Sequence, residues 1–332
     1  MLTRRALVAA PALLAAPSLL VGTRGRAAQR FAEALELARG FDQLHCLMVA
    51  QGGETVVDEV FSGPPSDRPV NVKSVSKTVV AALLGAAIDR GDLPGVGAAL
   101  GEVAPGLIPA AADPRVAGLT LEDLVTMRAG LERTSGENYG AWVSSRDWVA
   151  DALSRRFVAE PGGRMLYSTG SFHVLGAALA EATGESLLTQ ARARLGAPLG
   201  IEIPPWTRDP QGYYLGGNQM ALSPRAMLRF GEMARQGGRW EGAQVLPEAW
   251  LEASFEPRTR SPWSGLGYGY GWFVGRAGGG PLALARGYGG QVIAVAPAAE
   301  MTVAITSDPN RPARSAGYFG DLMGLIDRLV AA

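Results

Sequence analysis

The sequence predicts a mixed α/β (α+β) protein whose antiparallel sheet is assembled from both ends of the chain. Leu44–Ala50 and Thr55–Phe61 are apolar, β-branched runs on either side of the turn 51–54, which is typical of a hairpin. Residues 93–199 show helical apolar spacing, whereas short aromatic and β-branched runs return beyond Gly265. Strands near both termini therefore predict one sheet, with a helical region inserted in the middle and helices on the sheet faces.

Individual elements follow from the local pattern. Val75–Asp89 is long and apolar with few charges, so we expect a largely buried helix there. We assign the sheet part to about residues 29–73 and 225–332 and the helical part to about 74–224. Further helices are expected at Phe31–Ala38, Thr120–Arg128, Val174–Ala182 and Tyr318–Ala331, and further strands at Gly267–Phe273, Gln291–Ala296 and Thr302–Thr306.

Residues 1–28 have the pattern of a signal peptide. Arg4 and Arg5 precede an apolar stretch, Ala6–Val21, and Ala27-Ala28 supplies a small-residue cleavage region. Prolines interrupt this stretch and it is short for a bilayer span of roughly 20 residues, so we expect no stable membrane anchor. The sequence thus predicts a periplasmic or secreted protein, and the paired arginines permit twin-arginine export.

Composition restricts the partners and the redox chemistry. The chain has 31 basic and 31 acidic residues; removing the four arginines of residues 1–28 leaves 27 basic against 31 acidic. This small acidic excess argues against nucleic acid as a partner. Cys46 is the only cysteine, so no internal disulfide can form, and its apolar surroundings predict a core position in a strand.

Several familiar chemistries are excluded by the motifs. The sequence has no G-x-S-x-G, H-E-x-x-H, C-x-x-C or Walker pattern. His45 and His173 are the only histidines, which excludes a multi-histidine metal site and leaves two candidates for a Ser-His-Asp triad. Each is more typical of a structural histidine in its apolar context. We expect neither a metal nor an organic cofactor.

Ser74-Val75-Ser76-Lys77 is the strongest local signal. Ser74 and Lys77 are three apart at the start of the predicted helix, so their side chains share one face, and the free N–H groups of a helix N-terminus favour negative charge on the serine. A capping serine beside a solvated lysine is the alternative. The apolar residues after Lys77 favour burial instead, which would lower its pKa and let it act as a base. Ser76 is a competing nucleophile, but it points to a different face from the adjacent lysine.

Three segments carry a resemblance to a known family. Asn71–Val80 resembles the S-x-x-K segment of the serine β-lactamase and DD-peptidase superfamily, in its class C β-lactamase-related and esterase branch. Leu119–Leu131 is similar to the helix and loop that follow in that branch. Glu160–Gly170 resembles the second motif, Tyr-x-Asn, with Tyr167 as its tyrosine and Thr169 in place of the asparagine. This variant is similar to the 6-aminohexanoate-dimer hydrolase-like group.

The region of the third motif departs from the family. Where Lys-Thr-Gly or His-x-Gly is usual, the chain has Arg286-Gly287-Tyr288-Gly289-Gly290, with neither lysine nor histidine. The resemblance implies that the N–H of Ser74 and one N–H from the Tyr288, Gly289 and Gly290 turn form the oxyanion hole, with Thr169 and Arg286 near the substrate. Arg286 is the one residue here that could bind a substrate carboxylate.

The resemblance implies a β-lactamase/transpeptidase-like fold and acyl transfer in two halves. Ser74 attacks a carbonyl, Lys77 or the Tyr167 phenolate accepts its proton, Tyr167 protonates the leaving group, and water releases the acid. We expect a small amide or ester as substrate, as in 6-aminohexanoate-dimer hydrolases or esterases. A β-lactamase or D-Ala-D-Ala carboxypeptidase is the alternative within this chemistry, and a catalytically silent ligand receptor is the alternative from another class.

Overall fold

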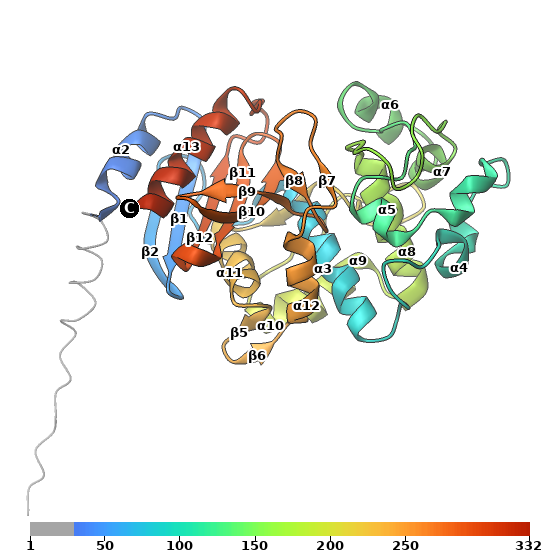
Figure 1. The fold of residues 1–332 in the computed structure, drawn as a ribbon, viewed down its shortest axis with the longest axis horizontal. Helices are drawn as coiled ribbons and strands as arrows, with labels where there is room; N and C mark the ends of the chain where they lie inside the picture. The colour runs from blue at the N-terminus through green and yellow to red at the C-terminus, as the bar shows by residue number, and fades with distance from the viewer. Residues whose placement is uncertain (1–29) are drawn as a thin grey trace, which may run out of the picture.

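The computed structural model describes residues 30–332, so the expected signal peptide, 1–28, lies outside the described residues. Its main feature is an eight-stranded antiparallel sheet (Figure 1). The amino-terminal hairpin joins the carboxyl-terminal strands through β1, in which Val49 pairs with Val303 of β12. The predicted fold class is confirmed. In spatial order the strands are β2 (Glu54–Val60), β1 (Leu44–Gln51), β12 (Met301–Ser307), β11 (Gln291–Ala296), β10 (Gly280–Gly287), β9 (Phe273–Ala277), β8 (Gly267–Tyr268) and β7 (Thr259–Arg260).

Helices cover both faces of the sheet. Gly231 of α11 (Pro224–Arg235) lies so close to the sheet that a Cβ there would meet Thr302 at 2.5 Å. On the other face α2 (Ala32–Arg39) and α13 (Tyr318–Ala331) pack together, and Phe319 of α13 contacts Arg286 of β10. Because both faces are covered, every residue of β11 and β12 is buried, as in a sheet with no solvated side.

A helical region lies beside the sheet (Figure 1). Its two long helices are apolar on all sides, which requires burial all round. Residues 75–87 of the first and 169–179 of the second are buried, and the two helices pack against each other. The helices between the sheet segments are α3 (Val75–Asp89), α4 (Leu100–Val103), α5 (Leu121–Val125), α6 (Tyr139–Val143), α7 (Trp148–Leu153), α8 (Thr169–Thr183), α9 (Leu187–Ala191) and α10 (Ala197–Leu199), and α12 (Glu248–Phe255) follows α11.

Most predicted elements are present, one predicted strand is wrong, and β10 and several short strands were not predicted. The helix predicted at Val75–Asp89 and the closing helix have the expected bounds, and α8 begins earlier than expected, at Thr169. The strand predicted over Gly267–Phe273 is broken, because Gly271 adopts φ 76° and its carbonyl accepts a hydrogen bond from Thr78 Oγ1 (2.7 Å). The chain turns there into β9. The longest strand that was not predicted, β10, lies between β9 and β11.

A small two-stranded sheet leads into α3. β3 (Val70–Lys73) pairs antiparallel with β4 (Met220–Leu222), and the register shifts between Asn71 and Lys73. Lys73 adopts a left-handed backbone with φ 51°. Ser74 follows directly and precedes the first residue of the buried helix. The irregular end of β3 therefore places residue 74 at the boundary between sheet and helical region. One more short pair, β5 (Arg239–Trp240) and β6 (Ala243–Gln244), lies away from this point.

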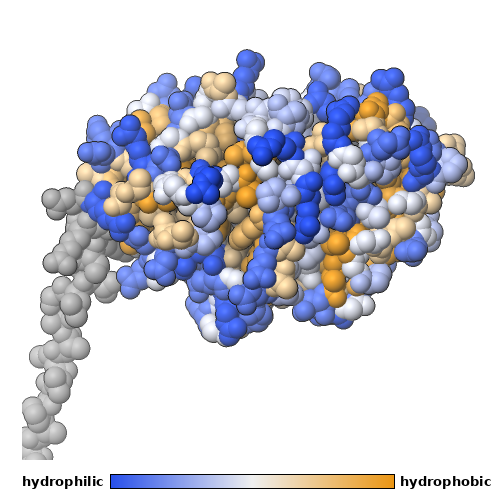
Figure 2. All heavy atoms as spheres, viewed as in Figure 1, coloured by the Kyte–Doolittle hydropathy of each residue, from blue (hydrophilic) through white to orange (hydrophobic). Residues whose placement is uncertain are grey.

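The surface is mixed in polarity. Hydrophilic residues cover most of the face in Figure 2, with apolar residues scattered between them. Four large hydrophobic side chains are exposed in the described part of the chain, namely Val60, Val158, Trp263 and Tyr288. No helix within residues 30–332 combines the length and apolar character needed to cross a membrane.

Candidate active site

Ser74 lies at the N-terminus of α3 with its hydroxyl available. It makes no side-chain capping bond to the helix, although serine is a common cap. Its Oγ instead accepts a hydrogen bond from Lys77 Nζ at 3.0 Å. The serine thus meets the one lysine that shares its helix face.

Lys77 is buried, with 1% of its surface exposed, and all three of its polar contacts come from this site. Besides Ser74, its Nζ contacts the carbonyl of Gly217 at 2.5 Å and Thr169 Oγ1 at 3.3 Å. Burial lowers the pKa of Lys77 from 10.5 to about 7. A neutral amine would donate two N–H bonds to Gly217 and Thr169 and point its lone pair at the Ser74 hydroxyl. The lysine is therefore arranged to accept that proton.

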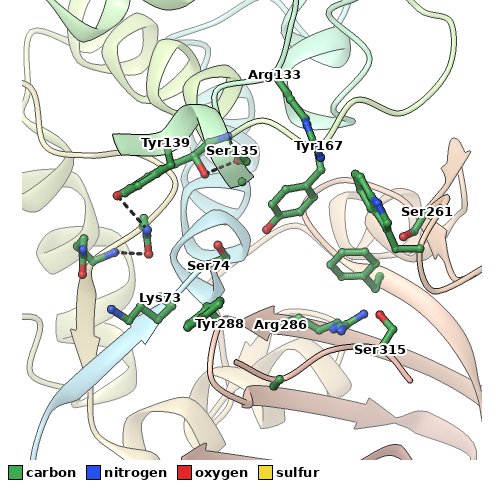
Figure 3. Close-up of a pocket in the computed structure, with 18 residues that line it drawn as sticks. Lys73, Ser74, Arg133, Ser135, Tyr139, Tyr167, Ser261, Arg286, Tyr288 and Ser315 are labelled. Carbon is green, nitrogen blue, oxygen red and sulfur yellow. Dashed lines mark hydrogen bonds between the residues drawn. The ribbon is translucent and has the colours of Figure 1, made fainter. Parts of the chain in front are cut away.

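Tyr167 lies across from Ser74 on the segment before α8 (Figure 3). Its ring centroid is 5.0 Å from Lys77 Nζ, and its ring stacks on Phe273 at 6.3 Å. Burial raises the pKa of Tyr167 above 10, while a hydrogen bond to Ser74 and the charge of Arg286 lower it in part. The net direction is upward, so the phenol holds its proton at neutral pH.

Thr169 is fixed by Ser135, a residue that the sequence analysis did not select. Ser135 Oγ accepts from Thr169 N and is 2.9 Å from Thr169 Oγ1. Gly217, the acceptor for Lys77, was also not selected as a site residue. The adjacent Gly216 packs tightly against α8, because a Cβ there would meet the carbonyl of Phe172 at 2.1 Å. This close approach holds the loop against α8.

The turn between β10 and β11 approaches Ser74 from the sheet. A Cβ on Gly287 would meet the Val72 carbonyl at 2.3 Å, so glycine allows the end of β10 to contact β3. Tyr288 lines the cavity and is 53% exposed. Gly289 and Gly290 do not line it; they face the Asp308 carbonyl and the Tyr318 ring instead.

A cavity of about 540 Å³ joins these groups (Figure 3). Of the predicted site residues, Ser74, Tyr167, Thr169, Arg286 and Tyr288 line it; Lys77 does not line it but contacts Ser74. Among residues 30–332, no Asp or Glu lines it. The other lining residues are Lys73, Arg133, Ser135, Gly136, Tyr139, Asn218, Gln219, Ser261, Trp263, Phe273, Gly287, Ala313 and Ser315.

Arg286 is a buried cation in this cavity. Its guanidinium lies over the Phe319 ring at 3.1 Å and near Phe273, and burial lowers its pKa from 12.5 to about 10. Within the described residues it has no carboxylate partner closer than 4 Å. A cation without a protein anion is suited to bind a substrate anion.

The two histidines lie outside the cavity. His45 is in β1, and His173 is fully buried in α8, where its Nε2 is 2.9 Å from Asp209 Oδ2. His173 Nδ1 accepts a bond from Gly216 N at 3.4 Å. Neither imidazole contacts Ser74. His173 thus supports the loop that carries the Gly217 carbonyl.

The fold and this arrangement define the class. The site has a serine at a helix N-terminus, a buried lysine on the same helix and a tyrosine that faces them. It lies between an antiparallel sheet and a helical region. This combination is typical of the β-lactamase/transpeptidase type of serine hydrolase. The β-lactamase family model matches residues 45–325, most of the chain. The protein therefore belongs to the β-lactamase family.

Solved structures show the same fold at low sequence identity. A candidate 6-aminohexanoate-dimer hydrolase from Bacillus anthracis has a TM-score of 0.73 at 18% identity, covering 90% of this chain and 81% of that one. A penicillin-binding protein homologue from Caulobacter crescentus has a TM-score of 0.74 at 19% identity, covering 91% of this chain and 97% of that one. EstCE1, a hydrolase with promiscuous acyltransferase activity, has a TM-score of 0.71 at 17% identity, covering 95% of this chain and 100% of that one. No curated protein matches the sequence.

Proposed function

We propose that the protein hydrolyses small amides or esters through an acyl-enzyme on Ser74. The observation that carries this proposal is the 3.0 Å contact between Ser74 Oγ and a buried lysine whose pKa is lowered to about 7. A lysine of this kind is a base at neutral pH, and a serine alone is a weak nucleophile.

The reaction divides into acylation and deacylation. In the first half the Ser74 oxygen bonds to the substrate carbonyl carbon while its proton moves to Lys77. The N–H groups of Ser74 and Tyr288 stabilise the negative oxygen. The tetrahedral species then collapses, the bond to the leaving group breaks, and Tyr167 protonates that group. The proton on Lys77 then passes to the Tyr167 phenolate, which restores both groups. In the second half a water adds to the acyl carbon while Lys77 accepts its proton; the bond from that carbon to Ser74 Oγ then breaks, and Lys77 returns the proton to Ser74 as the acid is released.

The structure supports one division of roles between Lys77 and Tyr167. Both were candidates for the base. The pKa of Lys77 is lowered and that of Tyr167 is raised, in each case mainly by burial. Burial disfavours the charged form of either group, so it makes the amine a base and keeps the phenol an acid. We therefore assign acceptance of the serine proton to Lys77 and donation to the leaving group to Tyr167.

A β-lactamase or D-Ala-D-Ala carboxypeptidase is the second candidate. Arg286 favours it, because this cation lines the cavity beside Tyr167 without a carboxylate partner among the described residues. Substrates of those enzymes carry a carboxylate near the scissile bond. The third-motif region offers no other cation, so we propose that simple esters and amides are the better substrates.

Labelling with a fluorophosphonate tests the nucleophile. We expect modification of Ser74 in the wild type and none in Ser74→Ala. Ser76→Ala is the matched control, since Ser76 bonds to the Lys73 carbonyl (2.5 Å) and to Met220 N (3.1 Å) rather than to Lys77. Modification that persists in Ser74→Ala refutes the assignment. A protein that is labelled at Ser74 but turns over no ester, amide or β-lactam is a receptor rather than an enzyme.

Comparison of substrates separates the two enzymatic candidates. The measurement is kcat/KM on 4-nitrophenyl butyrate and on a chromogenic cephalosporin, for the wild type and for Arg286→Ala. We expect the ester to be preferred. A wild type that prefers the cephalosporin, with the preference lost in Arg286→Ala, establishes the β-lactamase instead. Loss of a charge-assisted bond to a carboxylate corresponds to about 10- to 150-fold.

A further inference from the structure

Lys73 is a second amine at the site, on the opposite side of the nucleophile from Tyr167. It immediately precedes Ser74 and lines the cavity. In Figure 3, Lys73 and Tyr139 lie on one side of Ser74, and Tyr167 and Arg286 on the other. Within the described chain no carboxylate lies within 4 Å of the Lys73 amine, and no Asp or Glu lines the cavity. The cavity therefore has a basic side chain without a carboxylate partner on each side of Ser74.

The backbone holds Lys73 in an uncommon conformation. Its φ of 51° is left-handed, which is unfavourable for a residue with a long side chain. Three contacts maintain it: Asn71 Oδ1 accepts from Lys73 N at 2.9 Å, Ser76 Oγ donates to the Lys73 carbonyl, and Asn71 Nδ2 donates to Gln219 Oε1. Strain of this kind at a functional site persists only where the surroundings enforce it. Here they fix the direction in which the residue 73 side chain leaves the main chain.

The composition independently indicates a specific role for Lys73. Of the 31 Lys and Arg residues in the sequence, 29 are arginine, and Lys73 and Lys77 are the only lysines. A cation that merely contacts water could be arginine, as elsewhere in this chain. The two residue types differ in hydration and geometry, with lysine a compact point charge. Both lysines of the protein flank Ser74.

The side chains beside Lys73 offer donors as well. Asn218 Nδ2 donates to the Tyr139 hydroxyl at 3.1 Å, which leaves the Tyr139 proton available to an oxygen in the cavity. Lys73, Tyr139 and Asn218 all line the same cavity. An ammonium and a hydroxyl donor suit a carboxylate.

The position of Lys73 relative to Tyr167 indicates which part of the substrate lies against Lys73. The leaving group must lie next to the proton donor, Tyr167, so the other side of Ser74 holds the acyl part. We propose that Lys73 binds an anion on the acyl part, and that the preferred substrates are half-esters or half-amides of short dicarboxylic acids. This proposal rests on the proposed hydrolase function. Lys73 immediately precedes Ser74 and lines the same cavity, so the second carboxylate lies within reach of one lysine side chain from the nucleophile, which favours short dicarboxylic acids.

The kinetic test compares two esters with the same leaving group. The ratio of kcat/KM for 4-nitrophenyl hemiglutarate to that for 4-nitrophenyl valerate reports the acyl anion alone. We expect the wild type to favour the hemiglutarate, and Lys73→Met to lower the ratio by about 10- to 150-fold, as expected for loss of a charge-assisted bond. Lys73→Arg should retain only part of the preference, because it keeps the positive charge but not the compact ammonium group. Arg68→Met is the matched control, since it removes one exposed positive charge outside the cavity.

A second variant keeps the test valid if Lys73→Met fails to fold. Lys73→Gly removes the amine and is compatible with the left-handed backbone, so it should fold even where methionine does not. It should lower the ratio as Lys73→Met does. A ratio that stays within about twofold of wild type in the folded variants, or a wild type that favours the valerate, overturns the proposal.

A binding measurement distinguishes failure of this proposal from failure of the hydrolase function. Calorimetry with glutarate uses Ser74→Ala as the parent, in which no turnover occurs. We expect binding to weaken at least tenfold when Lys73→Met is added, and not when Arg68→Met is added. Lys73-dependent binding in a protein that hydrolyses no ester refutes the hydrolase function and leaves the anion site standing. Ester hydrolysis together with glutarate binding that is absent or independent of Lys73 refutes the anion site alone.

Discussion

Lys77 Nζ lies 3.0 Å from Ser74 Oγ although the lysine side chain is almost completely buried. No carboxylate in the described chain offsets its charge, and burial therefore lowers the pKa of the amine to about 7. The contact is possible because the two residues are three apart on α3, and the burial because the rest of α3 is apolar. The three-residue spacing thus brings Lys77 Nζ to Ser74 Oγ, and the packing of α3 lowers the pKa of that amine.

The pH dependence of activity should report this lysine. Activity needs the neutral amine, so kcat/KM should rise as pH increases through about 7 and then reach a plateau. The plateau should end above pH 10, because burial raises the pKa of Tyr167 and the phenol must keep its proton. A pH-rate profile on a neutral ester measures both limbs. An acidic limb near pH 4, typical of a carboxylate, contradicts the assignment.

Tyr167→Phe should affect amides more than activated esters. An amine must be protonated as it leaves, whereas 4-nitrophenolate leaves as a stable anion. We expect kcat/KM to fall about 100-fold or more on an amide and clearly less on a 4-nitrophenyl ester. Tyr268→Phe is the matched control, a buried tyrosine that does not line the cavity. Equal losses on both substrates would show that Tyr167 acts through packing rather than as an acid.

His173→Ala should reduce stability without removing the nucleophile. Its imidazole and the Asp209 carboxylate are both completely buried and 2.9 Å apart, so the variant leaves a buried carboxylate with fewer partners. We expect the free energy of unfolding to fall by about 3 kcal/mol, measured by urea denaturation. Fluorophosphonate labelling of Ser74 should persist below the transition. A stable variant that is no longer labelled would restore a histidine-dependent mechanism.

Gly287→Ala tests the approach of the sheet to Ser74. The new Cβ would collide with the Val72 carbonyl, two residues before Ser74, and shift the Tyr288 turn. A misplaced oxyanion donor costs about 100- to 1000-fold in kcat, so we expect a loss of that order in a folded protein. Gly97→Ala is the control, because a Cβ there meets nothing within 4 Å. Unchanged kcat in Gly287→Ala argues against Tyr288 as a donor.

The sequence predicted those features that depend on a pattern within one short segment. The bounds of α3 follow from an unbroken apolar run that ends at Asp89, and the spacing of Ser74 and Lys77 places both on one face. The break at Gly271 was not predictable, because the alternating aromatic and glycine residues around it are also typical of a strand. Only the contact of its carbonyl with Thr78 on α3 requires the turn.

The sequence by itself determined the fold class, through the order of strand and helix patterns along the chain. It also determined the candidate nucleophile and Lys77, through their spacing on one helix. Tertiary structure alone decided which distant groups meet them. The Gly217 carbonyl that holds Lys77 is 140 positions away, and Ser135 reaches Thr169 across 34. Tertiary structure also decided that Gly289 and Gly290 face away from the cavity while Lys73 lines it. Contacts between distant segments depend on how helices and strands pack, and no local pattern encodes that packing.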